Sequence, residues 1–346
     1  MEGATGSLHP PAYAGCPNRP GPRYGSESFS AGPGNSSESS PEADPVRKQF
    51  CPICGGADSI PVTSRKGYRY VCCIACRVVY VSPMPTADQV AAFYQNPAYF
   101  MGDEEVGYRD YAAMHKALAP HFRRRLRILA ESLPQRGRLL DVGCADGYFL
   151  QLAQAEGWEV AGVEISEPMA REASKRLGVP VVTSVDKLPP GAYDAVTLWE
   201  VAEHFPDPVA QLQRLAAFLR PGGILMLSTP NAGHWQAMRE PEAWSAYRPP
   251  AHLVLFTAGS LKMALEKAGF SPIRIWKVSP LPPLPGWVRR ITAPIARALA
   301  DGSAQPWGLA LYLWRAVRFL GWMWQKIAFP QDDIFMTLEA MAWRPA

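Results

Sequence analysis

The sequence predicts an α/β protein with a doubly wound parallel sheet, preceded by a small cysteine-rich module. Three observations predict this architecture. From residue 137 onward, apolar strand-like segments alternate with amphipathic helical segments, and such alternation favours parallel strands with helices on both faces. The first strand ends in an acidic residue followed by a turn of small residues. Two Cys-x-x-Cys pairs lie upstream, between residues 51 and 76.

The individual elements follow from hydrophobic periodicity and turn residues. Strands are expected at 138–142, 159–164, 180–184, 193–199, 223–229 and 271–279. Helices are expected at 147–156, 167–177, 207–219 and 257–268. The run Arg220-Pro-Gly-Gly223 should end a helix and turn the chain into the fifth strand. The run from Asp333 to Trp343 is expected to form the terminal strand.

The segment from Arg138 to Leu150 has the order of parts of a nucleotide-binding βαβ unit. Asp141 closes an apolar strand, the turn reads Asp-x-Gly-x-Ala-x-Gly, and Glu164 ends the next apolar run about 20 residues further on. The small residues let the backbone approach a ligand, and the later acid can hold ribose hydroxyls. A carboxylate ahead of the glycines repels pyrophosphate but suits a cationic ligand, which favours S-adenosylmethionine over NAD.

This turn resembles motif I of the class I S-adenosylmethionine-dependent methyltransferases. The segment Trp199-Glu-Val-Ala-Glu-His204-Phe-Pro-Asp-Pro is similar to the one after the family's fourth strand. The resemblance implies a Rossmann-like sheet of seven strands whose last strand is antiparallel, with the cofactor at the carboxyl ends of the strands. The cofactor-binding residues that it implies are Asp141, Gly143, Ala145, Gly147, Glu164, Asp186, Trp199 and Glu200.

The same resemblance implies a role for several of these residues. Asp141 would order the methionine end, Glu164 would grip both ribose hydroxyls, and Asp186 or its neighbours would edge the adenine. Ala145 stands where many members have glycine, and its small side chain should be tolerated. Another α/β nucleotide binder, such as a short-chain dehydrogenase, is the alternative. The glycine turn, ribose acid, Glu-His segment and Pro-Gly-Gly turn occur in family order, which favours the methyltransferase.

The cysteine module has the spacing of a zinc ribbon. Cys51 and Cys54 are separated from Cys73 and Cys76 by about 18 residues, and four thiolates would fill a structural Zn²⁺ site with no open position. Cys73 is preferred to its neighbour Cys72 because it gives the x-x spacing. Disulfides or a redox pair are the alternatives. The surrounding sequence resembles the ribbon ahead of a bacterial subgroup of these methyltransferases, some of which act on sugars or other small metabolites.

Three histidines are candidates for the base that methyl transfer to a hydroxyl would need, because histidine titrates near neutrality. His252 follows the fifth strand and is the first candidate, and His204 follows the fourth strand and is the second. His234 lies just beyond the run Ser228-Thr-Pro-Asn231 and is the third. Each would alternatively be structural or position the substrate.

The chain divides into four expected parts. Residues 1–47 are rich in Gly, Pro and Ser and are expected to be a disordered tail. Residues 48–85 form the ribbon, residues 86–136 a helical linker or lid, and residues 137–346 the methyltransferase domain. The basic run from Arg123 to Arg127 is expected to be a solvated helix face, or alternatively a contact to phosphate or lipid headgroups.

A hydrophobic insertion is expected at about 281–331, between the sixth strand and the last one. Residues 306–329 are rich in Trp and aliphatic side chains and carry Arg315, Arg318 and Lys326 on one helical face. The central arginines argue against a membrane span, so an interfacial helix is expected; burial against the domain or a homodimer partner is the alternative. A sixth parallel strand would place the insertion over the acceptor site, suggesting a lipid-like, lipid-linked or aromatic acceptor.

Composition agrees with these expectations. Of 346 residues, 48% are hydrophobic, and the net charge of +4 is too small to imply nucleic acid. The chain has no evident signal peptide and seven cysteines, so we expect a cytosolic protein that is peripheral to the inner face of a membrane if the insertion binds lipid. The expected activity is O-methylation of a small-molecule, glycan or lipid-linked acceptor. The alternatives are a zinc-ribbon binding protein on a degenerate methyltransferase scaffold, or a nucleic-acid-modifying methyltransferase.

Overall fold

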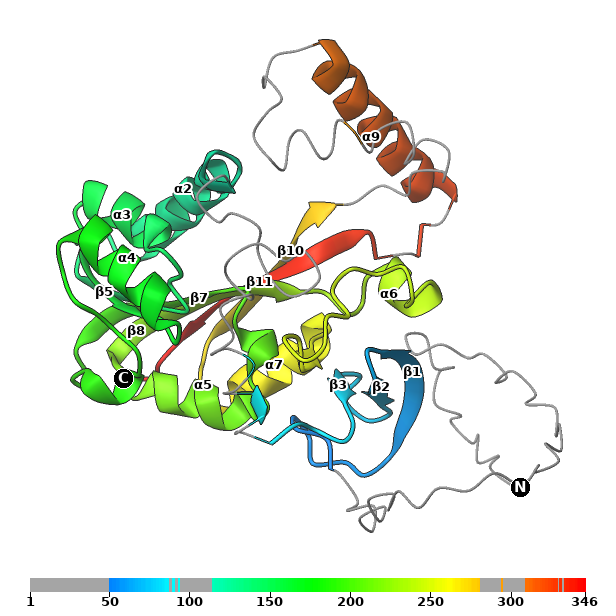
Figure 1. The fold of residues 1–346 in the computed structure, drawn as a ribbon, viewed down its shortest axis with the longest axis horizontal. Coiled ribbons are helices and arrows are strands. Elements are labelled where there is room, and N and C mark those ends of the chain that lie inside the picture. The colour runs from blue at the N-terminus through cyan, green and yellow to red at the C-terminus, as the bar shows by residue number, and fades with distance from the viewer. Residues whose placement is uncertain are drawn as a thin grey trace, which may run out of the picture.

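A computed structural model of the chain describes residues 50–86, 89–90, 93, 114–280, 294, 309–328, 330–331 and 333–346. The expected N-terminal tail at 1–47 therefore lies outside the described residues, as do parts of the linker and of the insertion. Figure 1 shows the arrangement of the described elements: a large central sheet, helices on both of its faces, and a small second sheet beside it.

The central sheet has seven strands in the order β10-β11-β8-β7-β4-β5-β6. Their bounds are β4 (Arg138–Val142), β5 (Glu159–Val163), β6 (Val181–Val182), β7 (Tyr193–Trp199), β8 (Leu219–Pro230), β10 (Ile273–Pro280) and β11 (Phe335–Trp343). The predicted α/β doubly wound fold and its antiparallel last strand are confirmed, because β11 runs antiparallel to both β8 and β10 while the remaining pairs are parallel.

One boundary differs from the prediction. The glycine pair was expected to form a turn before the fifth strand, but β8 begins at Leu219 and includes it. Backbone pairing explains the difference: Leu219 lies opposite Tyr193 on β7, and the register shifts before Ile224 pairs with Ala195. Gly222 has a φ of +76°, so the turn chemistry is present as an irregularity within the strand.

Helices cover the two faces of this sheet separately. On one face lie α2 (His115–Ser132), α3 (Tyr148–Ala155) and α4 (Glu167–Leu177); on the other lie α5 (Pro208–Ala216) and α7 (Ala258–Lys267) (Figure 1). Alternate residues of one strand serve the two cores: Leu139 is buried with the first group and Leu140 with the second. Short helices η3 (Val185–Lys187), η4 (Ala202–His204) and α6 (Trp235–Arg239) complete the described loops.

The second sheet is built from two segments that are far apart in the sequence. Strands β1 (Ser59–Arg65), β2 (Tyr68–Cys73) and β3 (Val79–Val81) come from the cysteine module, and β9 (Val254–Leu255) comes from the main domain. Val79 pairs with Leu255 and Tyr80 with Val254. The Tyr70 hydroxyl also donates to the backbone oxygen of His252 at 2.7 Å. The module is therefore joined to the domain through backbone pairing, in addition to side-chain packing.

The solvated face predicted for the basic run on α2 is wrong for Arg125. Arg125 is 8% exposed, and its guanidinium forms an ion pair of 2.9 Å with Glu339 on β11. Arg124 pairs with the same carboxylate, which also accepts a hydrogen bond from Trp276 Nε1 at 2.8 Å. Burial alone would raise the pKa of Glu339, but the two arginines outweigh it and hold that pKa below its usual value. The buried carboxylate of Glu339 thus binds both guanidinium groups and keeps Arg125 buried.

The described part of the insertion is α9 (Leu309–Ala328), which lies beyond the carboxyl end of β10 (Figure 1). Its described large apolar side chains are exposed, Leu320 to 63%, Trp324 to 66% and Ile327 to 71%. The side chains of Arg315, Arg318 and Lys326 lie outside the described set. Among the described residues, no helix combines the length and apolar character needed to cross a membrane.

Candidate active site and cysteine cluster

The turn between β4 and α3 has the backbone shape that its small residues predict. Gly143 and Gly147 have φ angles of +75° and +80°, which glycine adopts without strain, and Ala145 has a φ of +48°. A Cβ added to Gly143 would lie 2.6 Å from Cγ2 of Val201, in the segment after β7. The turn therefore packs directly against the segment that carries the expected histidine, with no room for a side chain between them.

Glu164 occupies the position expected of a ribose-binding acid. It follows β5 and is 4% exposed, and its carboxylate accepts hydrogen bonds from the backbone N–H groups of Ala145 and Ser166, each at 2.9 Å. Burial raises its pKa, and the two N–H groups oppose that effect. The carboxylate is thus fixed against the glycine turn by two backbone donors.

Asp141 lies at the end of β4 and is 1% exposed. The Thr197 hydroxyl, on the neighbouring strand β7, donates to its carboxylate at 2.6 Å. Burial raises the pKa of Asp141 to about 8, with the Thr197 hydrogen bond opposing and Glu164 adding to the rise. A cation bound nearby would favour the ionised form of this carboxylate.

Asp186 and Trp199, two further predicted cofactor contacts, lie in different surroundings. Asp186 lies in η3 after β6; its side chain is 68% exposed and forms an ion pair with Arg214. Trp199 ends β7, where its ring meets Phe149 edge-on at a centroid distance of 5.1 Å and lies 4.3 Å from the Arg125 guanidinium carbon. The Trp199 ring thus packs against α3, which follows the glycine turn, whereas the Asp186 side chain is exposed at the surface.

Two predicted histidines come together although they are far apart in sequence. The rings of His204 and His252 meet edge-on with centroids 5.0 Å apart. His252 Nδ1 lies 2.8 Å from the backbone oxygen of Ala246, which can only accept, so Nδ1 carries the proton and Nε2 keeps its lone pair. Burial lowers the pKa of His252 to about 4 and that of His204 well below its usual value. Both rings are therefore neutral at pH 7.

Glu203 completes this pair and was not among the predicted site residues. It is fully buried, and one carboxylate oxygen accepts from the Thr229 hydroxyl at 2.9 Å. Its other oxygen, Oε1, has no hydrogen-bond partner among the described residues and lies 4.0 Å from His204 Nε2. The signal was present in the sequence, since the segment Glu200-Val-Ala-Glu-His204 places this acid directly before the histidine.

Glu200 sits at the start of the same segment in a strained conformation. Its φ of +56° is uncommon for a residue with a Cβ. Two hydrogen bonds to Ser228 on β8 stabilise this conformation. The Glu200 N–H donates to the backbone oxygen of Ser228 at 3.0 Å, and the Ser228 hydroxyl donates to the Glu200 carboxylate at 2.8 Å. Burial raises the pKa of Glu200. Strain of this kind clusters at functional sites.

His234, the third candidate, has a structural place. It is fully buried at the start of α6, where its Nδ1 accepts from the N–H of Gln236 at 3.3 Å. Burial lowers its pKa to about 4. The described contacts bring His204 and His252 together, and the cluster that they form with Glu203 does not include His234.

A second set of residues near the cofactor turn was missed. Asp146, within the turn, is 2.8 Å from His115 Nε2 and 2.9 Å from the Arg176 guanidinium. The His115 ring stacks on Tyr148 with centroids 3.9 Å apart. His115 begins α2, outside the βαβ unit, so nothing in the local motif indicated that it would reach the turn. Asp146 itself stood within the predicted turn.

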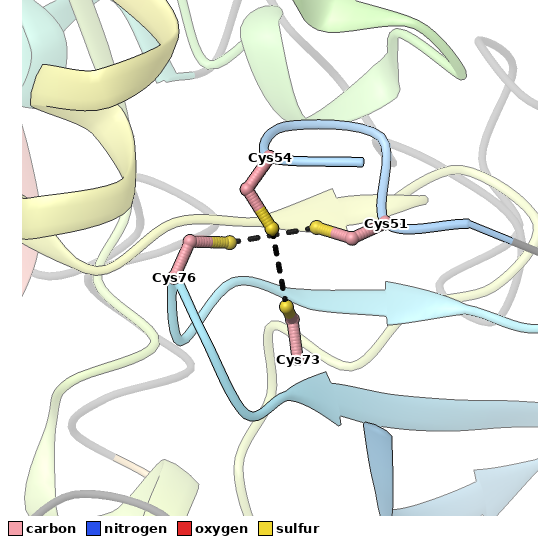
Figure 2. A group of neighbouring side chains, drawn as sticks. All are labelled: Cys51, Cys54, Cys73 and Cys76. Atoms are coloured by element: carbon pink, nitrogen blue, oxygen red, sulfur yellow. Dashed lines mark hydrogen bonds between the residues drawn. The ribbon is translucent and has the colours of Figure 1, made fainter. Parts of the chain in front are cut away.

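The four predicted cysteines converge (Figure 2). Cys51 Sγ lies 3.4 Å from Cys76 Sγ, and Cys54 Sγ lies 3.5 Å from Cys73 Sγ. Tetrahedral zinc with bonds of about 2.3 Å sets its sulfurs about 3.8 Å apart, so this cluster fits the ion after a small expansion. The two Cys-x-x-Cys pairs have matching backbone hydrogen bonds. The Gly55 N–H donates to the backbone oxygen of Cys51 at 3.0 Å, and the Arg77 N–H donates to the backbone oxygen of Cys73 at 3.0 Å.

Comparison with known proteins agrees with this geometry. Residues 112–275 match the family model described as a methyltransferase domain. The chain is 39% identical over 103 residues to a protein from Xanthomonas campestris pv. campestris named ubiquinone biosynthesis O-methyltransferase. Residues 112–275 therefore form a methyltransferase domain.

The similarity to these methyltransferases is partial. The Xanthomonas match covers 27% of this chain and 43% of the relative, and a Bordetella bronchiseptica relative of the same name is 37% identical over the same shares. The chain thus spans about two fifths of the length of the curated relatives it matches. A solved methyltransferase from Archaeoglobus fulgidus has 19% identity and a TM-score of 0.44, covering 65% of this chain and 93% of its own.

Proposed function

We propose that this methyltransferase moves a methyl group from S-adenosylmethionine to an oxygen of a small-molecule, glycan or lipid-linked acceptor. The observation that carries the proposal is the direct packing of the glycine turn against the Glu200–His204 segment. A Cβ added to Gly143 would lie only 2.6 Å from Cγ2 of Val201. A donor methyl held at the turn would be next to the side chains of that segment. The names of the partial relatives, which are O-methyltransferases, support oxygen as the acceptor atom.

In this proposal the donor end is held by the buried acids. Glu164, already oriented by two backbone N–H groups, would accept the ribose hydroxyls. Asp141 would order the methionine end, and Trp199 and Glu200 would border it. Asp186 would edge the adenine only if it left its ion pair with Arg214. The bound cofactor supplies the electrophilic sulfonium methyl, and these side chains align it for in-line attack.

At the acceptor end, His252 is the first candidate and His204 the second to act on the acceptor hydroxyl. The hydrogen bond from His252 Nδ1 to Ala246 leaves Nε2 as an acceptor. The Tyr70 hydroxyl, bonded to the backbone oxygen of His252, ties this residue to the cysteine module. The module would therefore help to position the candidate base, with structural Zn²⁺ at its four cysteines.

The exposed face of α9 supports a membrane surface as the docking partner. Leu313, Leu320, Trp324 and Ile327 recur at helical spacing, and each is at least 59% exposed. The three basic residues on this segment would add attraction to anionic lipid. Since α9 lies beyond the carboxyl end of β10, docking would bring a lipid-linked acceptor to the active-site edge (Figure 1).

Calorimetric titration of S-adenosylmethionine tests the proposed donor site. Glu164→Ala should weaken binding by about 2–4 kcal/mol, because two charge-assisted hydrogen bonds to the ribose are lost. Glu159→Ala is the matched control, since that carboxylate is 69% exposed and pairs with Arg138 at the opposite end of β5. Unchanged affinity in Glu164→Ala would overturn the assignment.

A further inference from the structure

Asp146, in the glycine turn between β4 and α3, is a buried carboxylate whose partners come from three helices. It is 4% exposed. One oxygen, Oδ1, accepts a hydrogen bond from the Tyr148 N–H at the start of α3 at 3.2 Å. The other, Oδ2, accepts from the Arg176 guanidinium on α4 at 2.9 Å and lies 2.8 Å from His115 Nε2 on α2. Residues of all three helices therefore meet on one side chain of the turn.

Arg176 binds the backbone of the turn as well as this side chain. Its Nε donates to the backbone oxygen of Asp146 at 2.9 Å, while Nη2 donates to the carboxylate. A planar guanidinium offers these donors in a fixed fork that a lysine ammonium lacks. The close approach of α4 depends on glycine at position 147, where a Cβ would lie 3.1 Å from Cβ of Ala173. The fork thus fixes both the main chain and the side chain of Asp146.

The backbone on both sides of Asp146 has an uncommon shape. Ala145 has a φ of +48° and Gly147 a φ of +80°. A residue with a Cβ keeps such a φ only where its surroundings hold it. Glu164 accepts from the Ala145 N–H at 2.9 Å, and Arg176 binds Asp146 next to it. The shape of the turn is therefore held by contacts from outside the turn.

His115 joins α2 to the same turn. Its ring stacks on that of Tyr148 with centroids 3.9 Å apart and planes inclined by 6°. When it is protonated, its positive charge lies beside Asp146. The same helix is joined to β11 by the ion pair of Arg125 with Glu339. A segment outside the βαβ unit thus supports the turn in addition to α4.

We propose that Arg176 is a positioning residue for the methyl donor, acting through Asp146, and that His115 supports the same carboxylate. This inference rests on the proposed function, which places the donor at the glycine turn. A ligand binds more tightly to backbone groups that already have their bound shape, because binding then requires no further ordering. Arg176 and His115 therefore raise the affinity for S-adenosylmethionine by fixing the turn.

Calorimetric titration of the full chain with S-adenosylmethionine tests the inference. Arg176→Lys keeps the charge and removes the fork, and it should weaken binding by about tenfold. Lys175→Ala is the matched control, because its side chain is 79% exposed on the same helix, and it should bind as the wild type does. A role in stability alone would lower the unfolding temperature and leave the affinity of the folded variant unchanged.

His115→Phe gives a second test on another helix. Phenylalanine keeps a ring to stack on Tyr148 and removes the nitrogen beside Asp146, so binding should weaken by about threefold. This variant tests the inference even where Arg176→Lys does not fold. Wild-type affinity in every folded variant of the two would overturn the inference.

A double variant shows whether Arg176 acts through Asp146. Asp146→Asn should weaken cofactor binding by itself, and adding Arg176→Lys should weaken it little further, because the same contact is removed twice. Fully additive effects would overturn the inference. A wild type that does not bind S-adenosylmethionine would overturn the proposed function together with this inference, whereas wild-type binding with unaltered variants would overturn the inference alone.

Discussion

The proposed donor end and the proposed acceptor end of this site are built in different ways. The proposed donor end comes from one βαβ unit: Asp141, Gly143, Gly147 and Glu164 lie within about 25 residues, and the Glu164 carboxylate accepts a hydrogen bond from the Ala145 N–H in the glycine turn. The acceptor end joins three distant segments: Glu203 and His204 after β7, His252 before β9, and Tyr70 from the cysteine module.

This difference has a consequence for stability. A site formed within one supersecondary unit depends mainly on that unit, whereas a site formed from distant segments depends on every interface between them. Here the interface includes the pairing of β3 with β9 and the hydrogen bond from Tyr70 to His252. Damage to the cysteine module should therefore reach the acceptor end first.

The largest expected effect comes from removing the proposed zinc ligands of the module. Cys51→Ser/Cys76→Ser should lose zinc and destabilise the chain by about 4 kcal/mol or more, because metal binding supplies the folding free energy of such a small module. Metal analysis and thermal unfolding measure both effects. Hydrogen exchange should accelerate at Val254 and Leu255 of β9, while β4, which carries Asp141, stays protected.

Cys144→Ser is the control for this pair, because it changes a buried thiol in the cofactor turn that is not part of the four-sulfur cluster. It should keep full zinc content. Equal loss of protection at the two ends of the site in the double variant would show that they are not separable. Full metal content in that variant would rule out these ligands.

An intermediate effect is expected for the pH dependence of cofactor affinity, through Asp141 at the proposed donor end. The pKa of Asp141 is about 8 in the free protein because burial disfavours its charge. If the cationic cofactor requires the carboxylate, binding releases a proton, so affinity should rise with pH between 6 and 8 by at most about tenfold per unit and level off above. Calorimetry in buffers of different ionisation enthalpy counts the proton. Asp141→Asn should bind more weakly and with little pH dependence; a wild-type affinity independent of pH would contradict the assignment.

The smallest effect on stability is expected from α9. Leu320→Glu/Trp324→Glu should change the free energy of unfolding by only about 0.5 kcal/mol per site, because both side chains are more than 60% exposed. Flotation with anionic vesicles should nevertheless fall, while cofactor affinity at the donor end stays unchanged. Glu131→Gln on α2 serves as a distant surface control. A wild type that does not float and runs as a stable dimer would assign this face to a subunit interface.

Much of the fold could be predicted because its signals are local. The alternation of apolar runs located β4, β5 and β7 to within a residue, and capping and helical period located α4 at the bounds predicted for it. The β8 boundary was missed because pairing with β7 extends the strand through a Pro-Gly-Gly run that favours a turn in isolation. Arg125 was misjudged because its partner Glu339 lies more than 200 residues away.

By itself, the sequence determined the doubly wound sheet, the glycine turn after its first strand, the acid that follows the next strand and the four converging cysteines, because each depends on spacing within a short segment. Tertiary structure alone decided that His204 and His252 meet and that Glu203 joins them with an oxygen left unpaired. It also decided that the cysteine module shares a strand with the methyltransferase domain. The physical reason is that contacts between distant segments depend on how buried surfaces pack, and no local period or motif records that packing.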